Sequence, residues 1–275
     1  PEDRAKVFGY MGAAFGLGFI IGPAIGGILG EYGPRVPFFA AAGISILNFA
    51  YGYFVLPETL PRESRRPFSL ARSNPVGVFK VFSTYKQALP LCIVMAMYFF
   101  ATSVYPAIWA FWGIARFNWS ESTIGLTLAI FGLITAVVQG GFTGPVVKWL
   151  GERNTAIFAL VTSVIAAAGY GLATGMSMVL ILFVIHAPEG FAQPALTALM
   201  SKDAPADAQG ELQGGIASAQ NLALLAGTVM FAQIFGYFLQ ESSPLQSPNV
   251  GYFISATLCL IALVIFVRLP SRTPA

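Results

Sequence analysis

The sequence has few charged residues. Lysine, arginine, aspartate and glutamate make up 10% of the 275 residues, whereas hydrophobic residues make up 56%. Soluble globular domains typically have roughly one quarter charged residues. The composition therefore excludes an ordinary water-soluble domain and indicates that lipid surrounds most of the chain.

Side chains that bind metals or act as nucleophiles are also scarce. The chain has one histidine, His186, and two cysteines, Cys92 and Cys259, which both lie within apolar stretches. This pattern indicates neither a disulfide framework nor a metal site, since one histidine and one nearby carboxylate fall short of the usual three or four ligands. The small hydroxyl residues in these stretches have no basic partner visible in the sequence. We therefore expect no enzyme activity, no cofactor and no metal.

Long apolar stretches dominate the sequence. Eight of them are long enough to cross roughly 30 Å of hydrocarbon at about 20 residues each. Alternation of period two, which is typical of membrane β-strands, does not recur. We expect an all-α membrane protein, a helical bundle with eight transmembrane helices. The expected spans are residues 7–29, 36–56, 88–114, 124–147, 155–174, 177–200, 212–239 and 250–267.

The basic residues are distributed unevenly between the loops. If the segment before the first span is cytoplasmic, only Arg35 and Arg116 of the 15 lysines and arginines fall on the opposite side. Short cytoplasmic loops are enriched in lysine and arginine, so this bias supports both the span count and the orientation. It places the long polar loop and the C-terminus in the cytoplasm. The basic charge reflects topology, so we expect a lipid bilayer and no nucleic acid as partner.

A polar interval rich in proline, serine and arginine separates two spans from six. We interpret residues 1–56 as the last two helices of an N-terminal half, 57–87 as a cytoplasmic linker and 88–275 as a C-terminal six-helix half. A disordered loop without a domain boundary is the alternative for the linker. Many transporters consist of two such halves. The chain begins with Pro1 rather than methionine, and this interpretation predicts that four upstream spans are missing.

A run of small residues interrupts the first span. It has the pattern G-x-x-x-G-P-x-x-G-G, formed by Gly18, Gly22, Pro23, Gly26 and Gly27. Glycines let a neighbouring backbone approach a membrane helix closely, and proline removes one backbone hydrogen bond. The run predicts a closely packed, slightly kinked helix. With the topology above it lies in the outer half of the membrane, where it would form part of a gate; ordinary small-residue packing is the alternative.

The same run resembles the antiporter motif of the drug/proton antiporters of the major facilitator superfamily. A second pattern, formed by Gly144, Lys148, Gly151 and Arg153, resembles the cytoplasmic loop motif G-x-x-x-[DK]-x-x-G-x-[RK] of that superfamily. Within it, the chain is similar to the bacterial tetracycline/proton antiporters. The resemblance implies a major facilitator bundle in the bacterial cytoplasmic membrane, which exports a drug or other small amphipathic compound in exchange for protons.

The chain departs from the tetracycline branch at two positions. Thr135 and Val164 stand where some members carry an ionisable histidine and aspartate. The resemblance therefore does not bring tetracycline itself, or the proton route of that branch, to this chain. A metabolite symporter and a nontransporting sensor or scaffold are the alternatives, and the intact glycine and proline run argues against the symporter.

Glu189 is the one acidic residue near the centre of an apolar stretch. A charged side chain there costs about 2.5–3.5 kcal/mol on insertion scales, so such residues usually face a cavity or a partner. His186 lies three residues earlier, and this spacing places both side chains on one helical face. We predict that Glu189 carries the coupled proton, unless the missing upstream helices hold the principal carboxyl group. A pair of Glu189 and His186 could relay protons or hold a cationic substrate. In the alternative, Glu189 stays protonated and bonds a neighbouring helix while His186 only packs.

Uncharged amides within the spans are candidates for a substrate cavity, because amides that face lipid would be unsatisfied. The candidates are Gln139, Gln193, Gln220 and Asn48. We expect the small-molecule substrate to contact Gln139, whereas hydrogen bonding between helices is the favoured interpretation for the other three.

Three aromatic residues crowd the outer end of the span at 88–114. They are Tyr105, Trp109 and Trp112. Tryptophan and tyrosine are enriched where membrane helices meet the lipid headgroups. We expect these three residues to anchor the helix at that interface.

Overall fold

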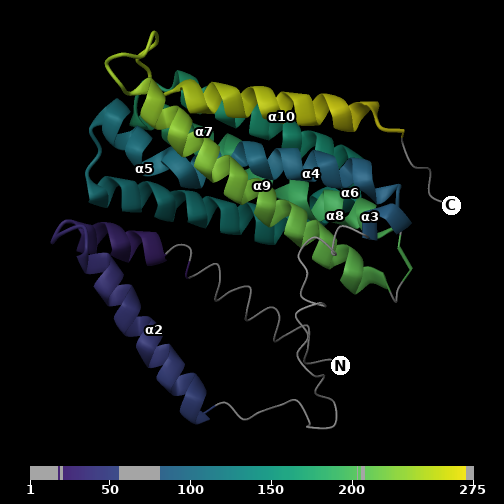
Figure 1. Cartoon of the computed structure of the whole chain (residues 1–275), viewed down its shortest axis with the longest axis horizontal. Coiled ribbons are helices and arrows are strands. Elements are labelled where there is room, and N and C mark those ends of the chain that lie inside the picture. Colours follow the sequence, from purple (N-terminus) through teal and green to yellow (C-terminus); the bar gives the residue numbers. More distant parts are fainter. Residues whose placement is uncertain (1–17, 19–20, 56–80, 203, 206–207, 271–275) are drawn as a thin grey trace. The chain divides into compact units, whose positions relative to one another are not determined.

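The computed structural model describes residues 18, 21–55, 81–202, 204–205 and 208–270. Every regular element in these ranges is a helix (Figure 1), so the all-α expectation is confirmed. The helices are α2 (Val36–Val55), α3 (Val81–Thr84), α4 (Ala88–Thr102), α5 (Val104–Phe117), α6 (Glu121–Leu172), α7 (Met176–His186), the 3-10 turn η4 (Ala187–Phe191), α8 (Ala192–Ser201), α9 (Gln209–Phe238) and α10 (Val250–Arg268).

The chain divides into two compact units. The first unit comprises Pro1–Pro75 and Trp119–Ile130, and the second comprises Val76–Asn118 and Phe131–Ala275. The expected division into 1–56, 57–87 and 88–275 stays a prediction, because residues 56–80 lie outside the described ranges.

Six helices of the described chain are long and apolar enough to cross a membrane. They are α2, α4 continued by α5, α6, α7 continued through η4 to α8, α9 and α10. A shorter apolar helix covers Ile21–Gly30, the end of the first expected span, and most of the earlier residues of that span lie outside the described ranges. Two other expected spans, 124–147 and 155–174, both belong to α6.

Gly151 divides α6 into two segments. The helix has 52 residues, which at about 1.5 Å per residue would far exceed the thickness of a bilayer. Gly151 has φ 76° and ψ 161°, a non-helical conformation that glycine adopts without a Cβ penalty. Because Gly151 lies within the loop expected from the sequence, the two segments correspond to the two expected spans.

The second unit is built around α4, which packs against α9 and α10. Its core includes Val94, Met95, Leu160, Leu196 and Phe266, all of which are almost fully buried. A buried hydrogen bond crosses between helices, from Ser255 Oγ of α10 to the Ala101 carbonyl of α4 at 2.8 Å. In Figure 1 these three helices run side by side.

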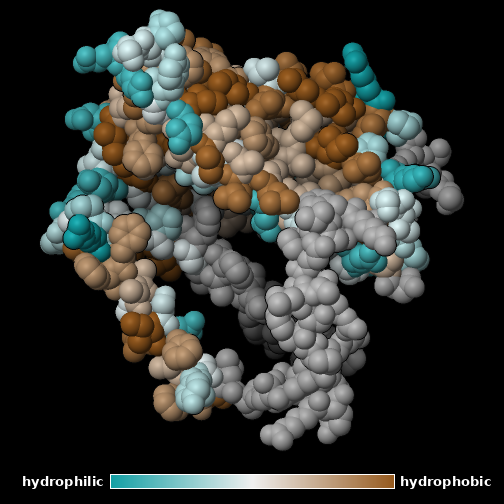
Figure 2. Space-filling view, viewed as in Figure 1, coloured by the Kyte–Doolittle hydropathy of each residue, from teal (hydrophilic) through white to brown (hydrophobic). Residues whose placement is uncertain are grey.

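Hydrophobic side chains also cover much of the outside of this unit. Phe111, Ile181 and Leu225 are each more than 60% exposed. Figure 2 shows hydrophobic atoms over the middle of the visible face of the bundle and hydrophilic atoms towards its two ends. Such a belt suits hydrocarbon in the middle and water at both ends.

In the first unit, part of the glycine and proline run makes a close backbone contact. A Cβ atom on Gly27 would lie 2.8 Å from the Glu121 carbonyl oxygen and 2.9 Å from Gly125 Cα. A Cβ atom on Gly125 would in turn lie 2.5 Å from the Pro23 carbonyl oxygen. The expected close approach of a neighbouring helix is therefore confirmed at Gly27, and the neighbour is the start of α6.

The other glycines of the run have no such neighbour among the described residues. Cβ atoms placed on Gly18, Gly22 or Gly26 would meet nothing within 4 Å. The close contact therefore involves one edge of the helix, and the gating role of the run stays a prediction.

Arg153 connects the turn at Gly151 to the end of α10 by hydrogen bonds. Its Nη2 atom donates hydrogen bonds to the carbonyl oxygens of Leu269 at 2.6 Å and Val267 at 3.0 Å. Its guanidinium group also lies 5.3 Å from the centre of the Phe266 ring. The last carbonyls of a helix have no partner within the helix, and a cation there is favoured by the helix dipole. The arginine of the loop motif is thus a C-terminal cap for α10.

We predict that Gly27→Ala destabilises the full-length protein by about 1–3 kcal/mol, because the new methyl group would collide with backbone atoms that cannot move aside. Gly26→Ala is the matched control, since its methyl group meets no described atom and alanine favours the helix. The measurement is thermal unfolding in detergent. Equal melting temperatures for the two variants would contradict the backbone contact.

We predict that Arg153→Ala lowers the stability of the protein by about 1–2 kcal/mol, since several carbonyls at the end of α10 lose a charged donor. Lys148→Ala is the control, because Lys148 is an exposed cation of the same motif. Thermal unfolding again gives the measurement. If Lys148→Ala costs as much as Arg153→Ala, net charge rather than the cap is responsible.

Candidate functional site

Glu189 lies in the middle of the membrane-spanning segment Met176–Ser201 and is only 6% exposed. It belongs to η4, a tight 3-10 turn between α7 and α8. Pro188 precedes it and has no N–H, so the local α-helical hydrogen bonding is interrupted. A 3-10 stretch within a longer helix often marks a functional hinge.

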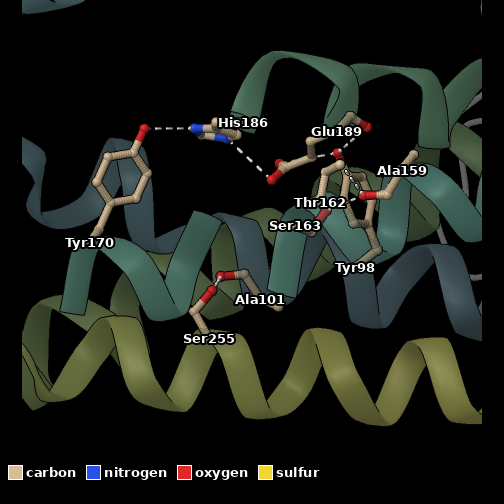
Figure 3. Close-up of polar contacts among 9 residues, drawn as sticks. All are labelled: Tyr98, Ala101, Ala159, Thr162, Ser163, Tyr170, His186, Glu189 and Ser255. Atoms are coloured by element: carbon tan, nitrogen blue, oxygen red, sulfur yellow. Dashed lines mark hydrogen bonds and ion pairs between the residues drawn. The ribbon is translucent and has the colours of Figure 1, made fainter. Parts of the chain in front are cut away.

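The Glu189 carboxyl group has two partners. Tyr98 of α4 donates its hydroxyl to Oε1 at 3.2 Å, and the same hydroxyl lies 3.3 Å from the Glu189 carbonyl oxygen. On the other side, His186 Nε2 lies 3.1 Å from Oε2, close enough for an ion pair. The ring nitrogen is not aligned for a hydrogen bond, and Oε2 has no hydrogen-bond donor among the described residues. Figure 3 shows the carboxyl group between these two side chains.

His186 continues the chain of polar groups. Its Nδ1 atom lies 3.2 Å from the hydroxyl of Tyr170, which belongs to the second segment of α6. The four side chains Tyr98, Glu189, His186 and Tyr170 thus form one connected row, drawn in Figure 3. We call these four residues the polar row. It brings together α4, η4, α7 and α6, and it consists of groups that can accept or donate protons.

Aromatic rings enclose the histidine. The ring centre of His186 lies 4.4 Å from that of Tyr105 and 4.6 Å from that of Phe131. Tyr170 meets the same ring edge-on at 5.7 Å. These ring contacts leave His186 only 6% exposed.

The expected interface anchors are part of this enclosure, so that expectation was wrong. Trp112 is fully buried and Trp109 is 7% exposed. Trp109 meets Tyr170 edge-to-face, with ring centres 5.3 Å apart, and Trp112 donates its Nε1–H to Asn249 Oδ1 at 2.8 Å. Tyr105, Trp109 and Trp112 are four and three residues apart, a spacing that places them on one face of α5, and this face is turned into the bundle.

Several buried oxygens lack hydrogen-bond partners among the described residues. They are the hydroxyls of Tyr105, Thr135 and Tyr252 and the Oε2 atom of Glu189. Leaving a buried polar group unsatisfied costs roughly 1–3 kcal/mol, so such groups call for an explanation.

The expected cavity residues lie in three different places. Gln193 and Gln220 line one cavity of about 660 Å³, together with Pro194, Thr197, Ala198, Ser201, Gln213, Ile216 and Ala217. The side chain of Gln139 lies directly on Gly190, beside Glu189, where any Cβ atom would overlap it. Asn48 is exposed on α2 in the first unit. Thr197, Ser201 and Gln213 were missed, although their spacing from Gln193 and Gln220 could have indicated them.

The remaining expected residues lie outside the polar row. Gly151 and Arg153 form the turn and the α10 cap, while Gly144 and Lys148 are exposed. No group of three or more histidine, cysteine, aspartate or glutamate residues suited to a metal ion occurs in the described part of the chain.

Comparisons with known proteins identify the family. The model of the Major Facilitator Superfamily matches residues 1–228. The chain is 33% identical over 262 residues to "Tetracycline resistance protein, class C" of Escherichia coli, which covers 95% of this chain and 65% of that protein. It is 34% identical over 235 residues to "Tetracycline resistance protein, class G" of Vibrio anguillarum, which covers 85% of this chain and 59% of that protein. The chain thus spans 59% to 65% of the length of these two relatives.

A solved structure has the same fold. The human organic anion transporter MFSD10 (TETRAN) matches with a TM-score of 0.66 and 22% sequence identity, over 93% of this chain and 62% of that one. At this identity the likeness concerns the fold alone, and it confirms the expected transporter bundle. Because the family model matches residues 1–228, the chain belongs to the Major Facilitator Superfamily.

Proposed function

We propose that the full-length protein exports a small amphipathic compound in exchange for protons across the bacterial cytoplasmic membrane. The loop at 57–87 and the C-terminus would lie in the cytoplasm. The observation that carries this proposal is the buried contact of Glu189 with His186 and Tyr98 inside a membrane-spanning segment. A carboxyl group and a histidine in such a place are costly, and in membrane proteins they mark ion and proton pathways.

Protonation of Glu189 would change how its segment is held. The ionised carboxylate attracts a protonated His186 and accepts the Tyr98 hydroxyl, whereas the neutral acid loses the charge attraction. Tyr98 belongs to α4, so a change in this bond alters the contact between α4 and η4. A proton that favours one arrangement and a substrate that favours the other would couple the two flows.

The position of Tyr170 supports a proton route to the outer side. Tyr170 lies close to the end of α6, which precedes the outer loop expected at 175–176. In the proposed topology the polar row then leads from this outer end to Glu189, in the middle of its span. An exporter driven by protons takes them up from the outside, and the polar row would provide a route from that side to Glu189.

The names of the relatives suggest drugs as the substrate class. The two relatives described above are named tetracycline resistance proteins, and another, 29% identical over 233 residues, is "Multidrug resistance protein 2" of Bacillus subtilis. We propose a drug-like substrate for this chain on that basis. Tetracycline belongs in any test panel, although Thr135 and Val164 stand where some members of that branch carry ionisable residues.

We predict that Glu189→Gln abolishes proton-driven export while exchange of substrate for substrate stays within about twofold of the unchanged protein. Glutamine can still accept the Tyr98 hydrogen bond but cannot carry a proton. The measurement uses proteoliposomes containing the full-length protein, a drug panel that includes tetracycline, and an imposed pH gradient. Glu241→Gln is the matched control, because Glu241 is exposed in the loop between α9 and α10.

Two outcomes would contradict this role. Proton-driven export that survives Glu189→Gln removes the residue from the coupling step. Loss of both export and exchange, together with a lower melting temperature, would make Glu189 a structural residue whose hydrogen bonds only hold α4 against η4.

A further inference from the structure

Two polar stripes face each other across the cavity between α8 and α9. On α8, Gln193, Thr197 and Ser201 follow at intervals of four residues, which places them on one face of the helix. On α9 the lining includes Gln213 and Gln220, seven residues apart and thus also on one face. Polar stripes on membrane helices are unsatisfied against lipid and normally line a path that holds water or a ligand.

The hydrogen bonds within the cavity leave much of its polar capacity unused. Gln213 Nε2 donates to Ser201 Oγ at 3.1 Å and joins the two helices at one end. Gln220 Nε2 points at the sulfur of Met95, a weak acceptor, at 2.6 Å. The exposed Gln193 amide makes no hydrogen bond to any described residue. Each glutamine amide can both donate and accept, so a ligand with mixed groups would find partners.

The lining contains no charged side chain among the described residues. Glu189 is the carboxylate of the segment that runs from α7 through η4 to α8. It is only 6% exposed and contacts His186 and Tyr98 rather than lining the cavity. A cation moved out of water needs a nearby opposite charge, and the described lining residues of α8 and α9 offer none. Pro194, Ala198 and Ile216 add apolar surface, so the lining as a whole is amphipathic but neutral.

We propose that this cavity binds the exported compound, and that the compound is an uncharged, drug-sized molecule with several hydroxyl, carbonyl or amide groups rather than a lipophilic cation. This inference rests on the proposed export function. The volume of about 660 Å³ lies within the range of pockets that hold drug-sized ligands. Three amides and two hydroxyls supply the directional contacts, and the apolar residues cover the remainder of the ligand.

The proposal separates the substrate site from the proton site. Glu189 and Gln193 lie four residues apart, one on η4 and the other on the first turn of α8. Substrate and proton would therefore not compete for one group but act on the same short segment. Export of an uncharged compound against protons also moves net positive charge inward, so a membrane potential alone, negative inside, would drive it.

The test uses two probes with the purified full-length protein. Chloramphenicol is an uncharged compound with an amide and two hydroxyls, and ethidium is a permanent cation of comparable size. We expect chloramphenicol to bind more tightly than ethidium. We expect Gln193→Leu and Gln220→Leu each to weaken chloramphenicol binding by about tenfold, since each leaves a polar group of the ligand unpaired. Gln233→Leu is the matched control, an exposed glutamine of α9 outside the lining.

A variant that introduces a charge should strengthen the binding of one probe, a result that misfolding would not produce. Gln193→Glu places a carboxylate in the cavity and should strengthen ethidium binding by about tenfold while weakening chloramphenicol binding. Equilibrium dialysis with radiolabelled chloramphenicol and ethidium fluorescence give the two affinities. Melting temperatures close to that of the unchanged protein confirm that the variants are folded.

The outcomes for the cavity and for proton coupling are distinct. Retained chloramphenicol binding in Glu189→Gln, with proton-driven export lost, supports both proposals. If chloramphenicol binds in a way that depends on Gln193 and Gln220 but no proton-driven export occurs, the substrate-binding cavity is supported and proton-coupled export is contradicted. Absence of chloramphenicol binding, tighter binding of ethidium, or equal effects of Gln193→Leu and Gln233→Leu would overturn the cavity proposal.

Discussion

A polar group inside a bilayer has to find its partners within the protein, because hydrocarbon offers none. This constraint explains most of the second unit. The carboxyl group of Glu189 requires the Tyr98 hydroxyl and the His186 ring, and the bond to Tyr98 in turn fixes how closely α4 approaches η4. The same constraint makes the Ser255 hydroxyl of α10 bond to the Ala101 carbonyl of α4. Hydrophobic packing fills the space between these contacts but does not by itself decide their positions.

The helices were largely predictable from the sequence, because length and apolarity are local properties. The break between two expected spans lies at Gly151, within the polar loop that the charge distribution had indicated. The meeting of His186 with Glu189 was also predictable, since both lie on one helical face three residues apart. Both cases depend on neighbours in sequence, where geometry follows from the helix alone.

The partners that come from other helices were not predictable. Tyr98 lies 91 residues before Glu189, and nothing local to it indicates a carboxylate partner. Likewise, the tight contact of Gly27 depends on Gly125 of another helix. The prediction that the aromatic residues of α5 anchor the helix at the interface was wrong for a related reason. Tyrosine and tryptophan occur both at the membrane interface and in the core of a helical bundle, and lipid and protein core are both apolar. The residue types alone therefore do not show whether a helix face is turned to the bundle or to the membrane. Only the assembled helices show which face is covered.

The contact between Gln139 and Gly190 has a mechanical consequence. Gly190 carries no side chain, so the Gln139 side chain lies directly on the backbone of the turn that holds Glu189. Well-packed contacts of this kind transmit displacement because they cannot be compressed. The turn therefore cannot swing towards α6 unless the first segment of α6 yields with it. A shift of the turn towards α6 would therefore displace this segment of α6 as well, so that a movement of a few residues around one carboxyl group would reach a whole membrane helix.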